Sequence, residues 1–195
     1  MCKVVGLTGP TGAGKSSVSS FLRNNGYLVL DCDTFAKQVM DSDEECINRL
    51  KRAFPDCFDD SKLNRKKLGK FVFSDKNGLK LLNSIVNPLI LKNLKKYVDD
   101  HADQTVILDG ATLIECGASE ICDCLIGILA SSDIRVRRIM ERDSLDRTDA
   151  QNRIASQHDD EFYKNNCTHV LYNDSDLFTV CSRVLQIIKE ANHNE

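Results

Sequence analysis

The sequence predicts an α/β protein built on a doubly wound, five-stranded parallel sheet. Short, nearly continuous apolar runs alternate with stretches in which apolar residues recur three and four positions apart. Such runs are typical of strands buried on both faces of a parallel sheet, and the stretches between them are typical of helices. The expected strands cover residues 3–8, 27–31, 105–109, 124–130 and 169–172. In this fold class, ligands bind at the carboxyl ends of the strands.

Helices are expected after the first, fourth and fifth strands. The stretch 16–25 ends before Gly26, a residue typical of helix termination. The stretches 133–143 and 177–191 also have helical spacing. Alternation of strands and helices of this kind favours the doubly wound arrangement.

Two stretches do not fit a simple alternation of strands and crossover helices. About 70 residues separate the second strand from the third, far more than one crossover helix needs. Helical spacing at 66–74, 78–86 and 88–98 predicts a packed helical insertion at about 60–100. A polar stretch at roughly 143–168 is expected to be irregular, within a lid region at about 138–168. We therefore expect residues 1–195 to form one domain that carries an insertion and a lid.

The composition excludes several classes of protein. A net charge of −3 argues against nucleic-acid binding as the main function. No apolar run reaches the roughly 20 residues needed to cross a bilayer, and no signal-type segment precedes the first strand. The nine cysteines include no CxxC pair, so reduced thiols are expected rather than a zinc site. Together these features predict a cytoplasmic protein without membrane or nucleic-acid partners.

The strongest motif is GPTGAGKSS at residues 9–17, which satisfies GxxxxGK[ST] between a strand and a helix. Glycines let backbone N–H groups turn toward phosphate oxygens, and the helix N-terminus adds partial positive charge. Lys15 is expected to reach the β- and γ-phosphates of ATP, and the Ser16 hydroxyl to ligate Mg²⁺. The expected nucleotide-binding residues of this loop are Gly12, Ala13, Gly14, Lys15, Ser16 and Ser17.

Other phosphate-loop proteins fit the sequence less well. A GTP switch would need an NKxD-type segment, and none is present. DKNG at 75–78 lies inside the helical insertion and is best explained as a helix cap or turn. A motor ATPase would usually have two acids after an apolar run, whereas TVILDG supplies only Asp109. Small-molecule kinases remain, in which the acceptor has its own pocket.

Two acidic residues follow the second expected strand, in DCDTFA at 31–36. A carboxylate at this edge can accept the proton of an attacking hydroxyl. We expect Asp33 to face the acceptor as the catalytic base and Asp31 to support it. The alternative is that either residue caps the next helix.

Arginines recur along DIRVRRIMERDSLDR. Arg135, Arg138 and Arg142 fall on one helical face, and Arg147 and Arg153 lie further into the lid region. Guanidinium groups can stabilise the charge that spreads over a transferring phosphoryl group. The alternative is a solvated basic helix whose arginines pair with Asp133, Glu141 and Asp143.

The chain resembles the dephospho-CoA kinase family over nearly its whole length. The segments that carry the resemblance are LTGPTGAGKSSV, DCDTFAKQV, LLNSIVNPLI, LDGATLIECG, RRIMERD, RIASQ and HVLYND. The loop is shared with many kinases. The pair of acids followed by Ala36 and Lys37, with NPLI and LIE, is more specific.

This resemblance implies ATP-dependent phosphorylation of the ribose 3′-hydroxyl of dephospho-CoA. It implies that Asp33 is the base, that Lys15 and Arg142 stabilise charge, and that Arg138 belongs to the lid. It also implies that the insertion binds the CoA precursor and that Asn173 lies near the adenine of ATP. Arg65, Lys66 and Lys67 could then face the pyrophosphate of the acceptor.

The sequence departs from the family pattern at three places. Asn87 stands where histidine is frequent, and we expect it to cap a helix that begins at Pro88. Ala111 replaces a frequent proline, and Cys167 and Thr168 replace alanine and aspartate.

Two other functions remain open at this point. The chain could be another small-molecule or nucleoside monophosphate kinase, or a regulatory module that binds ATP without turnover. A monomer or weak oligomer is expected.

Overall fold

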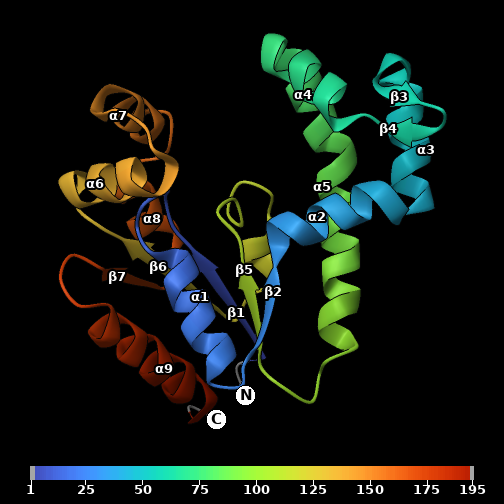
Figure 1. The fold of residues 1–195 in the computed structure, drawn as a ribbon. Coiled ribbons are helices and arrows are strands. Elements are labelled where there is room, and N and C mark those ends of the chain that lie inside the picture. Colours follow the sequence, from blue (N-terminus) through green and yellow to red (C-terminus); the bar gives the residue numbers. More distant parts are fainter. Residues whose placement is uncertain (1–2, 194–195) are drawn as a thin grey trace. The chain divides into compact units, whose positions relative to one another are not determined.

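The computed structural model describes residues 3–193. The chain divides into two compact units, one formed by residues 1–31 and 101–195 and the other by residues 32–100. We call them the sheet unit and the helical unit. Figure 1 shows the strands of the larger sheet in the first unit and long helices dominating the second.

The sheet unit contains the five expected strands, and the predicted fold class is confirmed. They are β1 (Val4–Thr8), β2 (Leu28–Asp31), β5 (Val106–Asp109), β6 (Cys124–Leu129) and β7 (His169–Tyr172). Their order is β2-β5-β1-β6-β7, and every neighbouring pair is parallel. The carboxyl ends of the strands therefore meet at one edge of the sheet.

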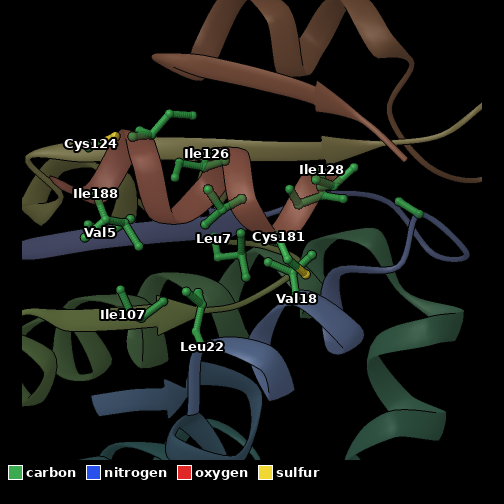
Figure 2. Packing of buried hydrophobic residues seen from close by; sticks show 14 residues of the cluster. Val5, Leu7, Val18, Leu22, Ile107, Cys124, Ile126, Ile128, Cys181 and Ile188 are labelled. Atoms are coloured by element: carbon green, nitrogen blue, oxygen red, sulfur yellow. The ribbon is translucent and has the colours of Figure 1, made fainter. Parts of the chain in front are cut away.

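Three expected helices are present in this unit: α1 (Lys15–Asn24), α6 (Ser132–Asp143) and α9 (Leu177–His193). Helices α1 and α9 pack on one face of the sheet through a shared apolar cluster. Figure 2 shows Val18 and Leu22 of α1 and Ile188 of α9 directed toward the strand residues of this cluster. These side chains are almost fully buried, which fixes the helix that follows the phosphate loop against the sheet.

The polar stretch at 143–168 is not irregular, so that expectation was wrong. It forms α7 (Arg147–Ala155) and α8 (Asp160–Asn166). Asp146 caps α7 by accepting the N–H of Asp149, and Asp159 caps α8 by accepting the N–H of Phe162. Capping aspartates favour helix starts even where the apolar stripe is short.

The helical unit is built from α2 (Cys32–Ser42), α3 (Glu44–Ala53), α4 (Arg65–Ser74) and α5 (Lys76–Asp99). A 3₁₀ turn (Pro55–Cys57) and a two-residue hairpin, β3 (Phe58–Asp59) with β4 (Lys62–Leu63), join α3 to α4. Asp75 caps α5 by accepting the N–H of Asn77, so DKNG is the expected helix cap.

The expected start of a helix at Pro88, capped by Asn87, was wrong. Helix α5 runs without interruption through both residues, so Asn87 does not cap a helix and Pro88 does not begin one. A proline in a helix interior costs about 3 kcal/mol or more. Here the buried stripe continues in phase on both sides of the exposed proline, through Val86, Leu89 and Leu94. Burial of this stripe outweighs the lost hydrogen bond.

Within residues 3–193 no helix is both long and apolar enough to span a membrane. The eight cysteines of the same range are thiols rather than disulfides. The ninth, Cys2, lies outside the described residues. Five of the eight are buried: Cys32, Cys46, Cys57, Cys124 and Cys181.

Candidate active site

The phosphate loop leaves the carboxyl end of β1 and ends at the first residue of α1. Gly14 stands at the N-cap in the left-handed region (φ 94°), and no side chain caps the helix. The first N–H groups of an uncapped helix are donors for an anion. A Cβ at Gly14 would collide with the amide nitrogen of Asn173, so this position requires glycine.

Lys15 forms an ion pair with Asp109, the last residue of β5. Both side chains are largely buried, and the Arg23 guanidinium lies 4.0 Å from the other oxygen of Asp109. The parallel register places Asp31 of β2 beside Asp109. Lys15, Asp31 and Asp109 therefore lie at the edge of the sheet where the sequence predicted the site.

Arg138 contacts the outer side of the phosphate loop. Its guanidinium donates to the carbonyl oxygens of Gly12 and Ala13, at 3.3 Å each, and to that of Asn173 at 3.0 Å. A carbonyl held from outside orients its peptide plane, so the loop N–H groups can face inward.

Arg135 and Arg142 also contact the loop, so the expected arginine face is directed toward it. The Nε of Arg135 donates to the carbonyl of Thr11 at 3.0 Å, and Nη2 of Arg142 donates to the Thr11 hydroxyl at 3.3 Å. Arg135 is only 4% exposed, and burial lowers the pKa of its guanidinium. Arg135 is therefore neither a solvated surface arginine nor exposed to a ligand.

Arg142 differs from the other two because its side chain is 57% exposed. It forms two 2.8 Å hydrogen bonds with Asp143. The bond from Arg142 holds the pKa of the Asp143 carboxyl below its ordinary value, and Arg153 pairs with the same carboxylate. Arg147 pairs with Asp133 at 3.4 Å. Ion pairs with Asp133 and Asp143 of α6 therefore engage the guanidinium groups of Arg147 and Arg153, and Arg142 is also paired with Asp143.

Asn173 follows β7 and is 2% exposed. Its side-chain amide donates to the Ala13 carbonyl at 2.8 Å, and its backbone N–H donates to the Leu129 carbonyl at 2.8 Å. Its Oδ1 is buried and has no hydrogen-bond partner among the described residues. An orphaned buried oxygen is costly, which is typical of a site where a ligand supplies the missing donor.

Ala13, Ser16 and Ser17 differ in which of their polar groups are already hydrogen-bonded within the loop. Ala13 is buried, and its N–H donates to the Pro10 carbonyl at 3.3 Å. The Ser17 N–H donates to the Gly14 carbonyl at 3.0 Å. The side chains of Ser16 and Ser17 are exposed in the first turn of α1.

The two acids of DCDTFA do not lie on one extended segment, because α2 begins at Cys32. Asp31 ends β2 in the sheet unit, and Asp33 lies in the first turn of α2 in the helical unit. Both are exposed. A carboxylate in a first helical turn is also favoured by the helix dipole.

The basic residues at the start of α4 are largely engaged inside the helical unit. Arg65 pairs with Asp41 at 2.9 Å and donates to the Lys37 carbonyl at 2.6 Å. Lys67 pairs with Asp59, and Lys66 is exposed.

Sequence reasoning missed two participants. Asp109 entered only as a single acid, although its place at the end of a strand beside β1 was a signal for a partner of Lys15. Gln157 entered only as the last residue of RIASQ, with no role of its own, and its side-chain oxygen accepts the N–H of Thr11 at 3.0 Å.

The sequence profile described as dephospho-CoA kinase matches residues 3–178. A Fusobacterium nucleatum protein named dephospho-CoA kinase is 31% identical over 184 residues, which cover 93% of this chain and 94% of that protein.

Solved structures of similar fold include two with the following likeness to the chain. The crystal structure of TT1252 from Thermus thermophilus has a TM-score of 0.80 at 32% identity and covers 96% of both chains. A dephospho-CoA kinase from Campylobacter jejuni has a TM-score of 0.72 at 24% identity, covering 98% of this chain and all of the other, and this likeness shows the fold. With its phosphate loop, its arginine-bearing α6 and a profile match over most of its length, the chain belongs to the dephospho-CoA kinase family.

Proposed function

We propose that this chain transfers the γ-phosphoryl group of ATP to the ribose 3′-hydroxyl of dephospho-CoA, which gives coenzyme A. The observation that carries the proposal is the extent of the family match. It covers the phosphate loop, the helical unit and α6, the parts to which the proposal assigns the two substrates. The geometry of the loop supports the nucleotide half of the reaction.

ATP would bind with its phosphates at the uncapped N-terminus of α1, near Gly12, Gly14 and Lys15. The side-chain amide of Asn173 lies beside Gly14, and its Oδ1 has no partner among the described residues; both observations support a place for Asn173 in the nucleotide site. Arg138 supports the loop from outside. The direct roles of Ala13 and Ser17 stay predictions, because their N–H groups already donate within the loop.

The donor set fits Mg²⁺ held partly by the nucleotide. Among the described residues no cluster of three or more His, Cys, Asp or Glu side chains is placed to hold a metal ion. Mg²⁺ commonly takes one or two protein oxygens and completes its shell with phosphates and water, and the Ser16 hydroxyl would be such a ligand. The ion would neutralise charge on the phosphate oxygens.

Asp33 would act as the base. Its carboxylate would take the proton of the 3′-hydroxyl as that oxygen attacks the γ-phosphorus, and the bond to the bridging oxygen of ADP would break. Lys15 and Arg142 would stabilise the charge on the transferring group. Arg142 is suited to this role because its guanidinium is more exposed than that of Arg135.

The helical unit would bind the CoA precursor, chiefly through residues at about 60–100, and residues at about 138–168 would form a lid. Lys66 and Lys67 are the exposed members of the basic group at the start of α4, and Lys67 is paired with Asp59. We also propose a cytoplasmic monomer or weak oligomer that has no nucleic-acid partner. The thiol state of the described cysteines supports that compartment.

An ADP-release assay with a panel of acceptors tests the proposal. The panel is dephospho-CoA, cytidine monophosphate, adenosine monophosphate and shikimate. We expect turnover with dephospho-CoA to exceed that with the others by at least about 10²-fold in kcat/KM, because remote contacts to an extended substrate contribute transition-state binding. Equal or better activity with a mononucleotide would support the alternative of a nucleoside monophosphate kinase.

Asp33→Asn tests the assignment of the base. We expect kcat to fall by about 10²–10⁴-fold with the Kd for ATP nearly unchanged, because Asp33 lies outside the phosphate loop. Asp31→Asn should cause a smaller loss. Asp56→Asn, an exposed carboxylate of the same unit, is the matched control. Retained kcat in Asp33→Asn would remove this residue from the mechanism.

A further inference from the structure

Gln157 is the half-buried residue in an otherwise exposed segment between α7 and α8. Its neighbours Ser156 and His158 are exposed. Its backbone N–H donates to the Ile154 carbonyl at 3.1 Å, which continues the last turn of α7. A half-buried glutamine in such a segment needs partners for its amide.

The side chain of Gln157 closes a ring of hydrogen bonds with Thr11 and Arg135. Its Oε1 accepts the Thr11 N–H at 3.0 Å and Nη2 of Arg135 at 3.2 Å. The Nε of Arg135 donates to the Thr11 carbonyl at 3.0 Å. Both backbone polar groups of Thr11 are therefore held, one by each side chain.

Thr11 lies in the first half of the phosphate loop, directly before Gly12. A Cβ at Gly12 would lie 2.9 Å from the Arg135 carbonyl, so the loop packs closely against α6 at this point. Since the N–H of Thr11 donates to Gln157, it is already engaged and is not offered to a ligand. Gln157 therefore fixes the direction of the Thr11 amide within the loop.

Arg135 also depends on Oε1 of Gln157 for a hydrogen bond. The guanidinium is buried, and no carboxylate forms an ion pair with it among the described residues. A buried cation without a paired anion relies on neutral acceptors. The two acceptors available to it here are the Thr11 carbonyl and Oε1 of Gln157.

We propose that Gln157 is a positioning residue for the phosphate loop. Gln157 acts through Thr11 and Arg135 and holds the loop in its nucleotide-binding conformation. The proposal rests on the proposed ATP-dependent reaction only for its kinetic consequence. The ring requires an acceptor at this position and makes no use of the amide hydrogens of Gln157. The chemistry therefore predicts that glutamate can replace glutamine and that leucine cannot.

Gln157→Leu, Gln157→Glu and Gln157→Asn are the test variants. We expect Gln157→Leu to lower kcat/KM for ATP by about 10–100-fold, because small displacements of positioning groups have effects of this size. KM for dephospho-CoA should change less than about twofold. Gln157→Glu should stay within about threefold of wild type. Gln157→Asn, one methylene shorter, should resemble Gln157→Leu.

Gln151→Leu is the matched control, because Gln151 is an exposed residue of α7 in the same region. Hydrogen exchange of the Thr11 amide supplies a readout that needs no catalysis. Exchange should be at least about tenfold faster in Gln157→Leu than in wild type, Gln157→Glu or Gln151→Leu. The Kd for ADP, measured by calorimetry without acceptor, should rise in the same variant.

Several outcomes would overturn the proposal. Gln157→Leu could match Gln151→Leu in ATP kinetics and Thr11 exchange, or Gln157→Glu could be as impaired as Gln157→Leu. If Gln157→Leu does not fold, normal ADP affinity and Thr11 protection in Gln157→Asn would contradict the proposal equally. If dephospho-CoA proves not to be the acceptor, the exchange and ADP measurements still decide the role of Gln157 and separate its failure from that of the proposed function.

Discussion

The sheet unit and the helical unit differ in whether they bury polar side chains. Five polar or charged side chains are buried among those that the structure describes, and all five lie in the sheet unit: Thr8, Ser19, Asp109, Arg135 and Asn173. Four of them contact the phosphate loop or Lys15 directly, namely Ser19, Asp109, Arg135 and Asn173. In this unit burial of polar groups serves the site.

In the helical unit, polar side chains hold helix ends and lie at the surface. Asp43, Asn64 and Asp75 cap α3, α4 and α5. The ion pair of Lys67 with Asp59 is about half exposed. Such contacts stabilise single helices by small amounts.

This difference has a consequence for mutations. Burying a polar group is unfavourable unless its partners are present, so the loss of one partner in the sheet unit should affect stability and ATP binding together. A cap in the helical unit should affect stability alone. Three substitutions test this separation.

The largest effect is expected for Lys15→Met. Turnover should fall by at least about 10²–10³-fold because a group that stabilises transition-state charge is lost. The buried carboxylate of Asp109 would also lose the nearer of its two cationic partners and keep only Arg23 at 4.0 Å, so the melting temperature should fall. Lys189→Met, at an exposed lysine of α9, is the control and should change neither quantity.

The double variant Lys15→Met/Asp109→Asn separates the two effects. Removal of the buried charge should restore part of the melting temperature without restoring turnover. Equal melting temperatures in the single and double variants would contradict the coupling inferred for the sheet unit.

An effect of intermediate size is expected for Asn173→Ala. The variant loses the hydrogen bond to the buried Ala13 carbonyl and should lower the free energy of unfolding by about 1–3 kcal/mol. It should also raise KM for ATP, because Asn173 supports the loop beside Gly14. Urea unfolding and steady-state kinetics measure the two quantities. Asn152→Ala, at an exposed asparagine of α7, should leave both near wild type.

The smallest effect is expected for Asp43→Ala in the helical unit. Loss of the α3 cap should cost about 1 kcal/mol of unfolding free energy and leave KM for ATP unchanged. The hydrogen bond from Asn93, followed by that from the Cys46 N–H, lowers the pKa of the Asp43 carboxyl from its ordinary 3.8. A rise in KM for ATP as large as that in Asn173→Ala would break the comparison between the units.

The pH dependence of this effect has a definite sign. Because the pKa of Asp43 is lowered by folding, its stabilisation is complete above the ordinary value of 3.8 and is lost as the pH falls through the lower folded value. The difference between wild type and Asp43→Ala should therefore shrink on acidification below that value. Asp43→Asn, which keeps a capping side chain, should lose less stability at neutral pH.

Much of the sheet unit was predictable from local patterns. Each expected strand is present within a residue or two, because a buried parallel strand leaves a continuous apolar run. The face shared by Arg135, Arg138 and Arg142 was also predictable from spacing alone. Helices α7 and α8 were not, because their stability depends on capping aspartates and tertiary packing rather than on a long apolar stripe.

The boundary at Pro88 shows a limit of local rules. Asn followed by proline is a strong start signal for a helix, yet α5 passes through both residues. The buried stripe that decides the outcome includes residues on both sides of the proline, and its energy exceeds the local preference.

By itself the sequence determined the order of strands and helices, the phosphate loop and the residues offered to a nucleotide, because these depend on spacing within a few turns or strands. Only the tertiary structure decided which groups hold the loop. Arg135 and Gln157 lie 124 and 146 residues from Thr11 along the chain. Contacts over such separations leave no local periodicity, since they arise from the packing of α6 and the α7–α8 segment against the loop.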